Sequence, residues 1–287
     1  MSTSVDTAFV RQYEREVKEA FQRSGSYLLQ TLRRVNNVKG SSTTFQVIGA
    51  GIATTKSRHG TITPMNQSHT AVQVILADFY AGDWIDKLDE TKINHDERLA
   101  IAHGGAMALG RKADDQIITQ LNATTQTQIA VTLTASGNAI AGLIEMVEGL
   151  DSNDVPNDGQ RYGCLTPRVW SIAMINQAFS SADYVTAGGR PFITGAPTDG
   201  RFKEWMNVKW FVHPNLPGVG TATANIYVYH KTAVGYAMGA DITADVTWHG
   251  DRAAHFVNHW MSGQAGLIDD PGVIEGQGDD TTAIPTS

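Results

Sequence analysis

Residues 41–64 read SSTTFQVIGAGIATTKSRHGTITP, a stretch rich in Thr, Ser, Gly and β-branched residues. Residues 43–48 predict one strand, and residues 71–79 predict a second strand beyond a turn-rich segment. A polar, cationic tip with Lys56 and Arg58 lies between them. We therefore expect a long β-hairpin. Because an isolated two-stranded hairpin is at best marginal in water, this one is expected to become ordered on another surface.

An amphipathic segment precedes the hairpin. Its apolar side chains recur every four residues, which draws one stripe along a helix of about four turns. The residues of this stripe are Phe9, Tyr13, Val17 and Phe21. Gly25 ends the pattern, and a weaker one begins at residues 27–35. A terminal helix of this kind packs on its own domain or on a neighbouring molecule, and the pattern leaves both open.

The longest helical pattern follows the hairpin, at residues 94–122. Asn94 and Glu97 have the spacing of a capping box at its start. Three glycines interrupt the pattern, although each costs about 1 kcal/mol relative to Ala inside a helix. Close approach of other backbone explains such glycines, whereas the apolar spacing alone also fits a core helix of any α/β protein. The apolar face carries Leu99, Ala102, Ala106, Leu109, Ala113, Ile117 and Leu121, and the glycines are Gly104, Gly105 and Gly110.

The rest of the chain mixes short strands and helices. Thr166 is placed as the N-cap of a helix with Pro167 at its first position, and this helix is expected to run to about residue 180. The tail beyond Gly276 is polar and is expected to fray. Residues 131–151 predict a strand and a short helix, further strands are predicted at 208–213, 225–231 and 243–248, and residues 253–261 fit either a strand or a helix.

Composition limits the classes of function. Hydrophobic residues make up 41% of the 287 residues and charged residues 18%, which suits a protein that covers much of its surface with copies of itself. The net charge of −7 argues against general affinity for nucleic acid. A lone cysteine, Cys164, excludes an internal disulfide framework and is expected to be buried. Without a membrane-length apolar stretch or a signal-peptide pattern, we expect a soluble protein made in the cytoplasm.

Candidate chemistry is weak throughout the sequence. The run Val47-Ile-Gly-Ala-Gly-Ile-Ala53 resembles the start of a dinucleotide-binding fingerprint, but its third glycine is missing and no helix is predicted after it. His249, His255 and His259 have a spacing that can bind zinc, yet their aromatic neighbours favour packed histidines. Cys164 lacks the signature of an activated thiol. We therefore expect no catalytic residue, no metal and no cofactor.

Three stretches carry a resemblance to a known family. The first is Gly163-Cys-Leu-Thr-Pro-Arg-Val-Trp-Ser-Ile-Ala173, the second is Ser181-Ala-Asp-Tyr184, and the third is Val234-Gly-Tyr-Ala-Met-Gly-Ala-Asp-Ile-Thr-Ala244. The third continues through residues 248–265 and 271–274. With the order of segments, these stretches resemble the major capsid protein of tailed bacteriophages, the Hong Kong 97-type fold.

The resemblance implies an α+β fold with four parts. It implies an N-terminal arm at residues 1–40 and an extended β-hairpin loop at 41–70. A peripheral domain with a long spine helix would comprise residues 71–135 and 223–287, and an inserted axial domain would comprise 136–222. Lys56 and Arg58 become candidates for contact with a neighbouring subunit, and Phe9, Tyr13 and Val17 become candidates for the docking face of the arm.

The resemblance also implies partners. Copies would form pentamers and hexamers in an icosahedral shell that encloses double-stranded DNA without sequence-specific contacts or a membrane. The short arm leaves no room for a built-in scaffolding region, so a separate scaffold protein is implied, together with a portal and a decoration protein. Two alternatives stay open at this point. One is a soluble α/β enzyme whose site is visible only in three dimensions, and the other is an encapsulin-like nanocompartment shell.

Overall fold

The computed structural model describes residues 25–90, 97–133, 139–176, 179 and 202–284. The chain forms two compact units, each made of segments that are distant in sequence. The first unit comprises Met1–Ser26, Asp78–Lys112 and Ala240–Ser262. The second unit comprises Tyr27–Ala77, Ala113–Gly239 and Gly263–Ser287. The predicted arm residues Phe9, Tyr13 and Val17 lie outside the described residues.

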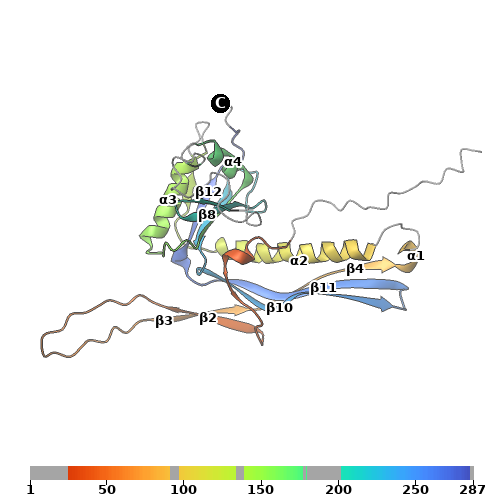
Figure 1. Ribbon diagram of the computed structural model, residues 1–287, viewed down its shortest axis with the longest axis horizontal. Helices are drawn as coiled ribbons and strands as arrows, with labels where there is room; N and C mark the ends of the chain where they lie inside the picture. Colours follow the sequence, from red (N-terminus) through yellow and green to blue (C-terminus); the bar gives the residue numbers. More distant parts are fainter. Residues whose placement is uncertain (1–24, 91–96, 134–138, 177–178, 180–201, 285–287) are drawn as a thin grey trace, which may run out of the picture. The chain divides into compact units, whose positions relative to one another are not determined.

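A six-stranded mixed sheet forms the main core of the second unit. Its strands follow the order β5-β12-β9-β6-β8-β7, and helices α3 (Ala139–Ser152) and α4 (Pro167–Ile175) pack against it (Figure 1). Gly163 lies where a Cβ atom would come within 2.2 Å of the Trp210 ring, so the sheet needs a glycine there. The strand bounds are β5 Ile129–Val131, β6 Arg161–Leu165, β7 Lys203–Trp205, β8 Val208–Val212, β9 Ala224–His230 and β12 Val273–Gly278.

The predicted hairpin is present. Strands β2 (Ser42–Ile48) and β3 (His69–Ile75) pair antiparallel from Ser42↔Ile75 to Ile48↔His69. The inner face of the hairpin buries Phe45 and Val74 in a cluster with Ala237 and Ile268, so the base of the hairpin has a core within its own unit. The distal loop has no such core. The expectation that the hairpin requires a foreign surface therefore applies to the loop and is wrong for the base.

Two predicted boundaries near the hairpin are wrong. The strand predicted over residues 71–79 is divided at Leu76, whose N–H donates to the Ser41 carbonyl, and β4 (Ala77–Asp86) then joins another sheet. The weak helical pattern at residues 27–35 is a 3-10 turn, Leu29–Thr31, followed by β1 (Arg33–Val35). β1 pairs parallel with β10 (Val234–His249) at residues 235–237, and this pairing overrides the local helical spacing.

Long strands and one long helix build the first unit. β10 and β11 (Ala254–Leu267) run next to each other in the sheet order β1-β10-β11-β4. β10 starts before the strand predicted at 243–248, and the ambiguous residues 253–261 belong to a strand. Helix α2 (Glu97–Leu121) follows β4 and the short helix α1 (Lys87–Glu90), and in this unit it lies along β4 and β11 (Figure 1).

The predicted long helix is confirmed from Glu97 onward, while Asn94 lies outside the described residues. The predicted apolar face is buried at Leu109, Ala113, Ile117 and Leu121. A Cβ atom on Gly110 would come within 2.7 Å of the backbone carbon of Gly25, so the expected close approach of backbone is confirmed there. At Gly105 the close neighbour is the His259 ring, and Gly104 has no atom within 4 Å of the added Cβ among the described residues.

Candidate functional site

The loop that joins β2 to β3, residues 49–68, is exposed along almost its whole length (Figure 1). Two backbone hydrogen bonds in this loop join Gly49 N–H to the Ser68 carbonyl at 2.8 Å and Gly60 N–H to the Ser57 carbonyl at 3.0 Å. Large apolar side chains also face solvent, including Ile52 at 81% exposed. A segment with few internal bonds and exposed apolar side chains is typical of a surface that another molecule covers.

Lys56 and Arg58 are both exposed near the tip of this loop. The structure therefore brings together the two predicted contact residues of the loop and keeps them accessible. Residues 41–77 contain no Asp or Glu, and their only Lys and Arg residues are Lys56 and Arg58, so this segment carries a net positive charge at the tip of the loop. This is the charge that an acidic partner surface would attract.

The distal half of β10 is the second exposed surface. Here one face of the strand carries Asp241 and Asp245, and the other carries Ile242, Val246 and Trp248. Residues 241–248 are exposed on both faces, and Trp248 is 51% exposed. Sequence reasoning missed this surface because alternation normally marks a strand with one buried face.

An aromatic cluster lies beside this surface in the first unit. The Trp84 ring of β4 is 4.5 Å from the Phe256 ring and 5.0 Å from the His249 ring, measured between centroids. The Arg252 guanidinium lies 4.5 Å from the centroid of Trp84. Trp84 is 39% exposed, and Tyr80 on the same strand is 70% exposed. Aromatic and arginine side chains in this arrangement are the residue types that dominate binding energy at protein interfaces.

A buried carboxylate of the second unit holds the backbone at Tyr27 and Leu28. Asp114 of α2 is fully buried and accepts the N–H groups of Tyr27 and Leu28, each at 3.1 Å. His213 Nε2 lies 3.3 Å from Asp114 Oδ2. Because Asn215 N–H donates to His213 Nδ1 at 3.2 Å, the His213 proton is on Nε2, and it is donated to Asp114. This network of hydrogen bonds therefore holds the segment at residues 27–28 in a defined position.

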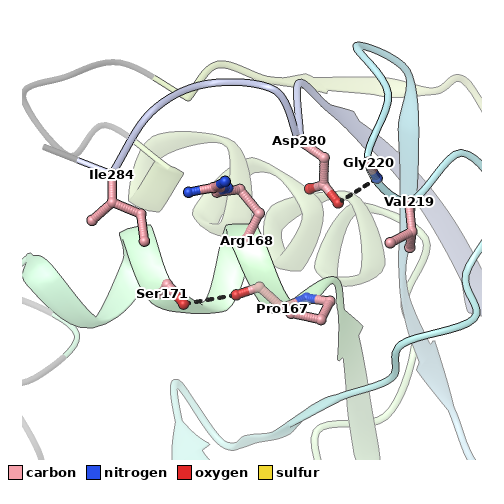
Figure 2. Close-up of a pocket in the computed structure, with 7 residues that line it drawn as sticks. All are labelled: Pro167, Arg168, Ser171, Val219, Gly220, Asp280 and Ile284. Atoms are coloured by element: carbon pink, nitrogen blue, oxygen red, sulfur yellow. Dashed lines mark hydrogen bonds between the residues drawn. The ribbon is translucent and has the colours of Figure 1, made fainter.

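A pocket of about 380 Å³ lies at the N-terminus of α4 (Figure 2). Thr166 caps this helix as predicted, because its Oγ1 accepts the Val169 N–H at 3.2 Å. The helix itself ends at Ile175 and does not reach residue 180. The Asp280 carboxylate accepts the Thr166 hydroxyl at 2.6 Å and the Gly220 N–H at 3.2 Å. The pocket wall thus already contains a carboxyl group near the N-terminal end of the helix.

The prediction that the C-terminal tail frays beyond Gly276 is wrong as far as residue 280. Asp280 is only 5% exposed, and its N–H donates to the Thr221 carbonyl. Asp270 accepts hydrogen bonds from Thr124, Thr125 and Gln126. Burial raises the pKa of Asp270, but the hydrogen bonds from Thr125 and Gln126 outweigh it, and the net pKa lies below the usual value. Asp270 and Asp280 therefore both accept hydrogen bonds from other parts of the same chain.

The sequence patterns that suggested chemistry have structural roles. Residues 47–48 end strand β2, and no helix follows them, so the fingerprint is a chance match. His255 and His259 lie on a strand, and His259 Nδ1 is 3.2 Å from the Ala81 carbonyl oxygen. Within the described ranges, no three His, Cys, Asp or Glu residues are placed to hold a metal ion. Cys164 is fully buried in β6.

Solved structures of shells share this fold. The chain is similar to the capsid of cyanophage P-SCSP1u at 19% identity and a TM-score of 0.75, covering 96% of this chain and 95% of that chain. It is similar to Mycobacterium phage Che8 at 16% identity and a TM-score of 0.72, covering 94% and 97%. A virus-like particle from Pyrococcus furiosus matches at 10% identity and a TM-score of 0.56, covering 88% and 92%. A search of curated protein sequences found no match.

A family model described as phage capsid protein matches residues 5–279, nearly the whole chain. In the described part of the chain, no helix is long and apolar enough to cross a membrane. The predicted Hong Kong 97-type fold agrees with the similar structures, and the predicted location in the virion agrees with the family. The chain belongs to the phage capsid protein family, and it is a shell-forming major capsid protein.

Proposed function

We propose that the chain is the major subunit of the icosahedral head of a tailed phage and that its shell encloses double-stranded DNA. Copies form pentamers and hexamers, and the DNA is held without sequence-specific contacts. The observation that carries the proposal is the family match over residues 5–279, together with an exposed loop that has no core of its own. The net charge of −7 supports a container that does not bind DNA tightly.

Other head proteins complete the proposed assembly. A separate scaffold protein would guide the first shell, a portal would occupy one vertex, and a decoration protein would bind the outside. The role of the chain itself is structural, with no reaction assigned to it. Many modest interfaces that act together would then give a stable container.

We assign the parts of the chain as the sequence predicts. The arm is residues 1–40, the extended loop 41–70, the peripheral domain 71–135 and 223–287, and the axial domain 136–222. One observation favours a larger axial domain. The six-stranded sheet takes β5, β9 and β12 from outside residues 136–222, and these strands share its hydrophobic core.

Two sets of residues are proposed to contact neighbouring subunits. Lys56 and Arg58 would meet an acidic surface, and their exposure on a loop without acidic residues supports this role. Phe9, Tyr13 and Val17 would form the docking face of the arm, supported by their four-residue spacing and by the anchoring of Tyr27 and Leu28 on Asp114. Isolated exposed charges contribute little to binding, so the loop needs its apolar side chains as well.

A second candidate is a cellular nanocompartment shell of the same fold. The similarity to the virus-like particle from Pyrococcus furiosus favours keeping it. The two candidates differ in their contents, because a phage head takes up DNA through a portal and a nanocompartment encloses protein cargo.

Electron microscopy with sedimentation tests the proposal. The chain would be expressed alone and then together with the genes next to its own. Closed shells, or discrete pentamers and hexamers, are expected, and co-expression with portal and packaging proteins should yield DNA-filled heads. A stable monomer or dimer under both conditions would contradict the capsid role. Shells that enclose only a cellular protein would favour the nanocompartment.

A further inference from the structure

Residues 27–32, which we call the strap, precede strand β1 in the second unit. The strap is packed into this unit, because Leu28, Thr31 and Leu32 are each at most 2% exposed. The Thr31 hydroxyl lies 2.5 Å from the Tyr229 hydroxyl of β9. The strap continues directly into β1, whose pairing with β10 fixes that end. Its other end depends on what holds the backbone at residues 27–28.

Two buried side chains, Asp114 and His213, hold this other end of the strap. The Asp114 oxygens accept the N–H groups of Tyr27 and Leu28, both at 3.1 Å, and Oδ2 also accepts the proton of His213 Nε2. His213 Nδ1 accepts the Asn215 N–H at 3.2 Å. Both Asp114 and His213 are 0% exposed. A second ring proton, on Nδ1, would point at a backbone N–H group, which cannot accept it.

His230 shows a different arrangement in the same unit. Its Nε2 lies 3.1 Å from Asp158 Oδ1, and its Nδ1 accepts the Thr232 N–H at 3.3 Å. Here the Thr232 hydroxyl also lies 2.8 Å from Nδ1, and a hydroxyl can accept a proton as well as donate one. The site of His230 therefore fits the ring with one proton or with two, whereas the backbone N–H at His213 fits the ring with one.

The other titratable groups that face the pair are tyrosines. Burial raises the pKa of Tyr236 to about 12 and the pKa of Tyr229 well above its ordinary value, and the charge of Asp114 contributes to both. The Tyr27 ring stands edge-on to the His213 ring, with 6.3 Å between the centroids. A neutral phenol gains no proton when the pH falls. Among these groups, acid therefore adds a proton to His213 or to Asp114.

We propose that Asp114 and His213 form an acid-sensitive latch, which holds the strap near neutral pH and releases it when His213 takes up a second proton. Histidine is the side chain whose charge ordinarily changes between about pH 5 and 8. The second proton displaces the Asn215 N–H, so the ring moves and Asp114 loses the donor at Nε2. A buried carboxylate that loses a donor is costly, and water supplies new donors when the strap opens. Since the open form holds the second proton without this conflict, acid favours it.

Opening the latch changes how the residues before the strap are tethered. With the latch closed, the chain is held at Tyr27 by α2, and with the latch open the first fixed residue is Arg33 in β1. The tether then gains the length of the strap, roughly 20 Å at about 3.3 Å per extended residue. The same N-terminal arm would therefore have a short reach at neutral pH and a longer one in acid. This device belongs to the single subunit and goes beyond the proposed capsid role.

Hydrogen exchange with mass spectrometry on the purified chain tests the latch between pH 7.5 and pH 5. Each rate would be divided by the intrinsic rate of an unfolded peptide at the same pH, so that protection alone is compared. We expect protection in peptides that cover residues 27–32 to fall at least about tenfold at pH 5, while peptides that cover Thr232 and β6 keep theirs. Unchanged protection of the strap, or an equal fall in all three regions, would overturn the proposal. The test needs no shell, so the latch and the capsid role can fail separately.

Two variants that take up no proton separate the roles of the ring nitrogens. His213→Gln places an amide donor near the Nε2 position, so its strap should stay protected at pH 5. His213→Asn places its amide near the Nδ1 position, out of reach of Asp114, so its strap should lose protection already at pH 7.5. His230→Gln is the matched control and should respond to acid as the unaltered chain does. A His213→Gln chain whose strap still loses protection in acid would overturn the proposal, and the pH series on the unaltered chain decides it where a variant does not fold.

Discussion

Gly104 and Gly110 lie on one helix and are equally unfavourable for it, yet the structure gives a reason for only one of them. A Cβ on Gly110 would collide with the Gly25 backbone, whereas a Cβ on Gly104 meets no described atom. Gly110→Ala is therefore expected to destabilise the subunit by about 1–3 kcal/mol through overpacking. Gly104→Ala, its matched control, should be neutral or stabilising by up to about 1 kcal/mol. Urea unfolding of unassembled subunits measures both, and equal effects would contradict the backbone contact.

Asp270 should make part of the stability depend on pH. Its pKa in the folded chain lies below the ordinary value of 3.8, so its contribution is complete only well above pH 3.8 and is lost as the pH falls through the lowered pKa. Asp270→Asn should cost about 1 kcal/mol at pH 7, since partial exposure screens the carboxylate, and the difference should shrink below pH 4. Thermal melting between pH 7 and pH 3 is the measurement. Asp269→Asn is the control, because the neighbouring Asp269 is exposed. A constant difference at every pH would show that charge is not involved.

At the scale of elements, Thr166 joins two parts that are distant in sequence. Its hydroxyl accepts the Val169 N–H at the start of α4 and donates to Asp280 of the tail. Thr166→Ala should lower the free energy of unfolding by about 1–2 kcal/mol, because the cap is lost and Asp280 loses a donor. Thr166→Ser keeps the hydroxyl and should fall between this variant and the unaltered chain. If Ala and Ser destabilise the subunit equally in urea, the buried methyl group matters and the hydroxyl does not.

Helices could be predicted where residues close together in the sequence determine where they form and start. The apolar period placed α2, and Thr166 with Pro167 placed the start of α4, because neighbouring residues carry both signals. The burial of Asp280 was not predictable, since it depends on Thr166, 114 residues earlier in the chain. The strand β1 was missed for the same reason, because its partner lies at residues 235–237. The exposed distal half of β10 was missed because its alternating polar and apolar side chains are the usual mark of a half-buried strand.

At the scale of the whole molecule, the chain has only 18% charged residues, and its loop at residues 49–68 and the distal half of β10 are exposed. Both features fit a subunit that covers part of its surface with other copies. Surface that stays uncovered in one copy is available for contact with another. Lys56 and Arg58 could be chosen as candidate contacts from the sequence, because a segment rich in Thr, Ser and Gly predicts an exposed loop. The exposed distal half of β10 was not identified, because its exposure depends on the order of the strands in the sheet.

This exposure predicts a difference in proteolysis between subunit and shell. Trypsin should cut unassembled subunits first after Lys56 or Arg58, because an exposed loop with few backbone bonds opens easily. In closed shells the same cuts should be at least about tenfold slower, since a neighbour that covers the loop makes it costly to open. Cleavage after Arg161, which is 1% exposed in β6, should be slow in both states and serves as the control. Equal rates at Lys56 and Arg58 in subunits and shells would mean that the loop stays uncovered after assembly, and its cationic tip would then have to face the solvent or another head protein.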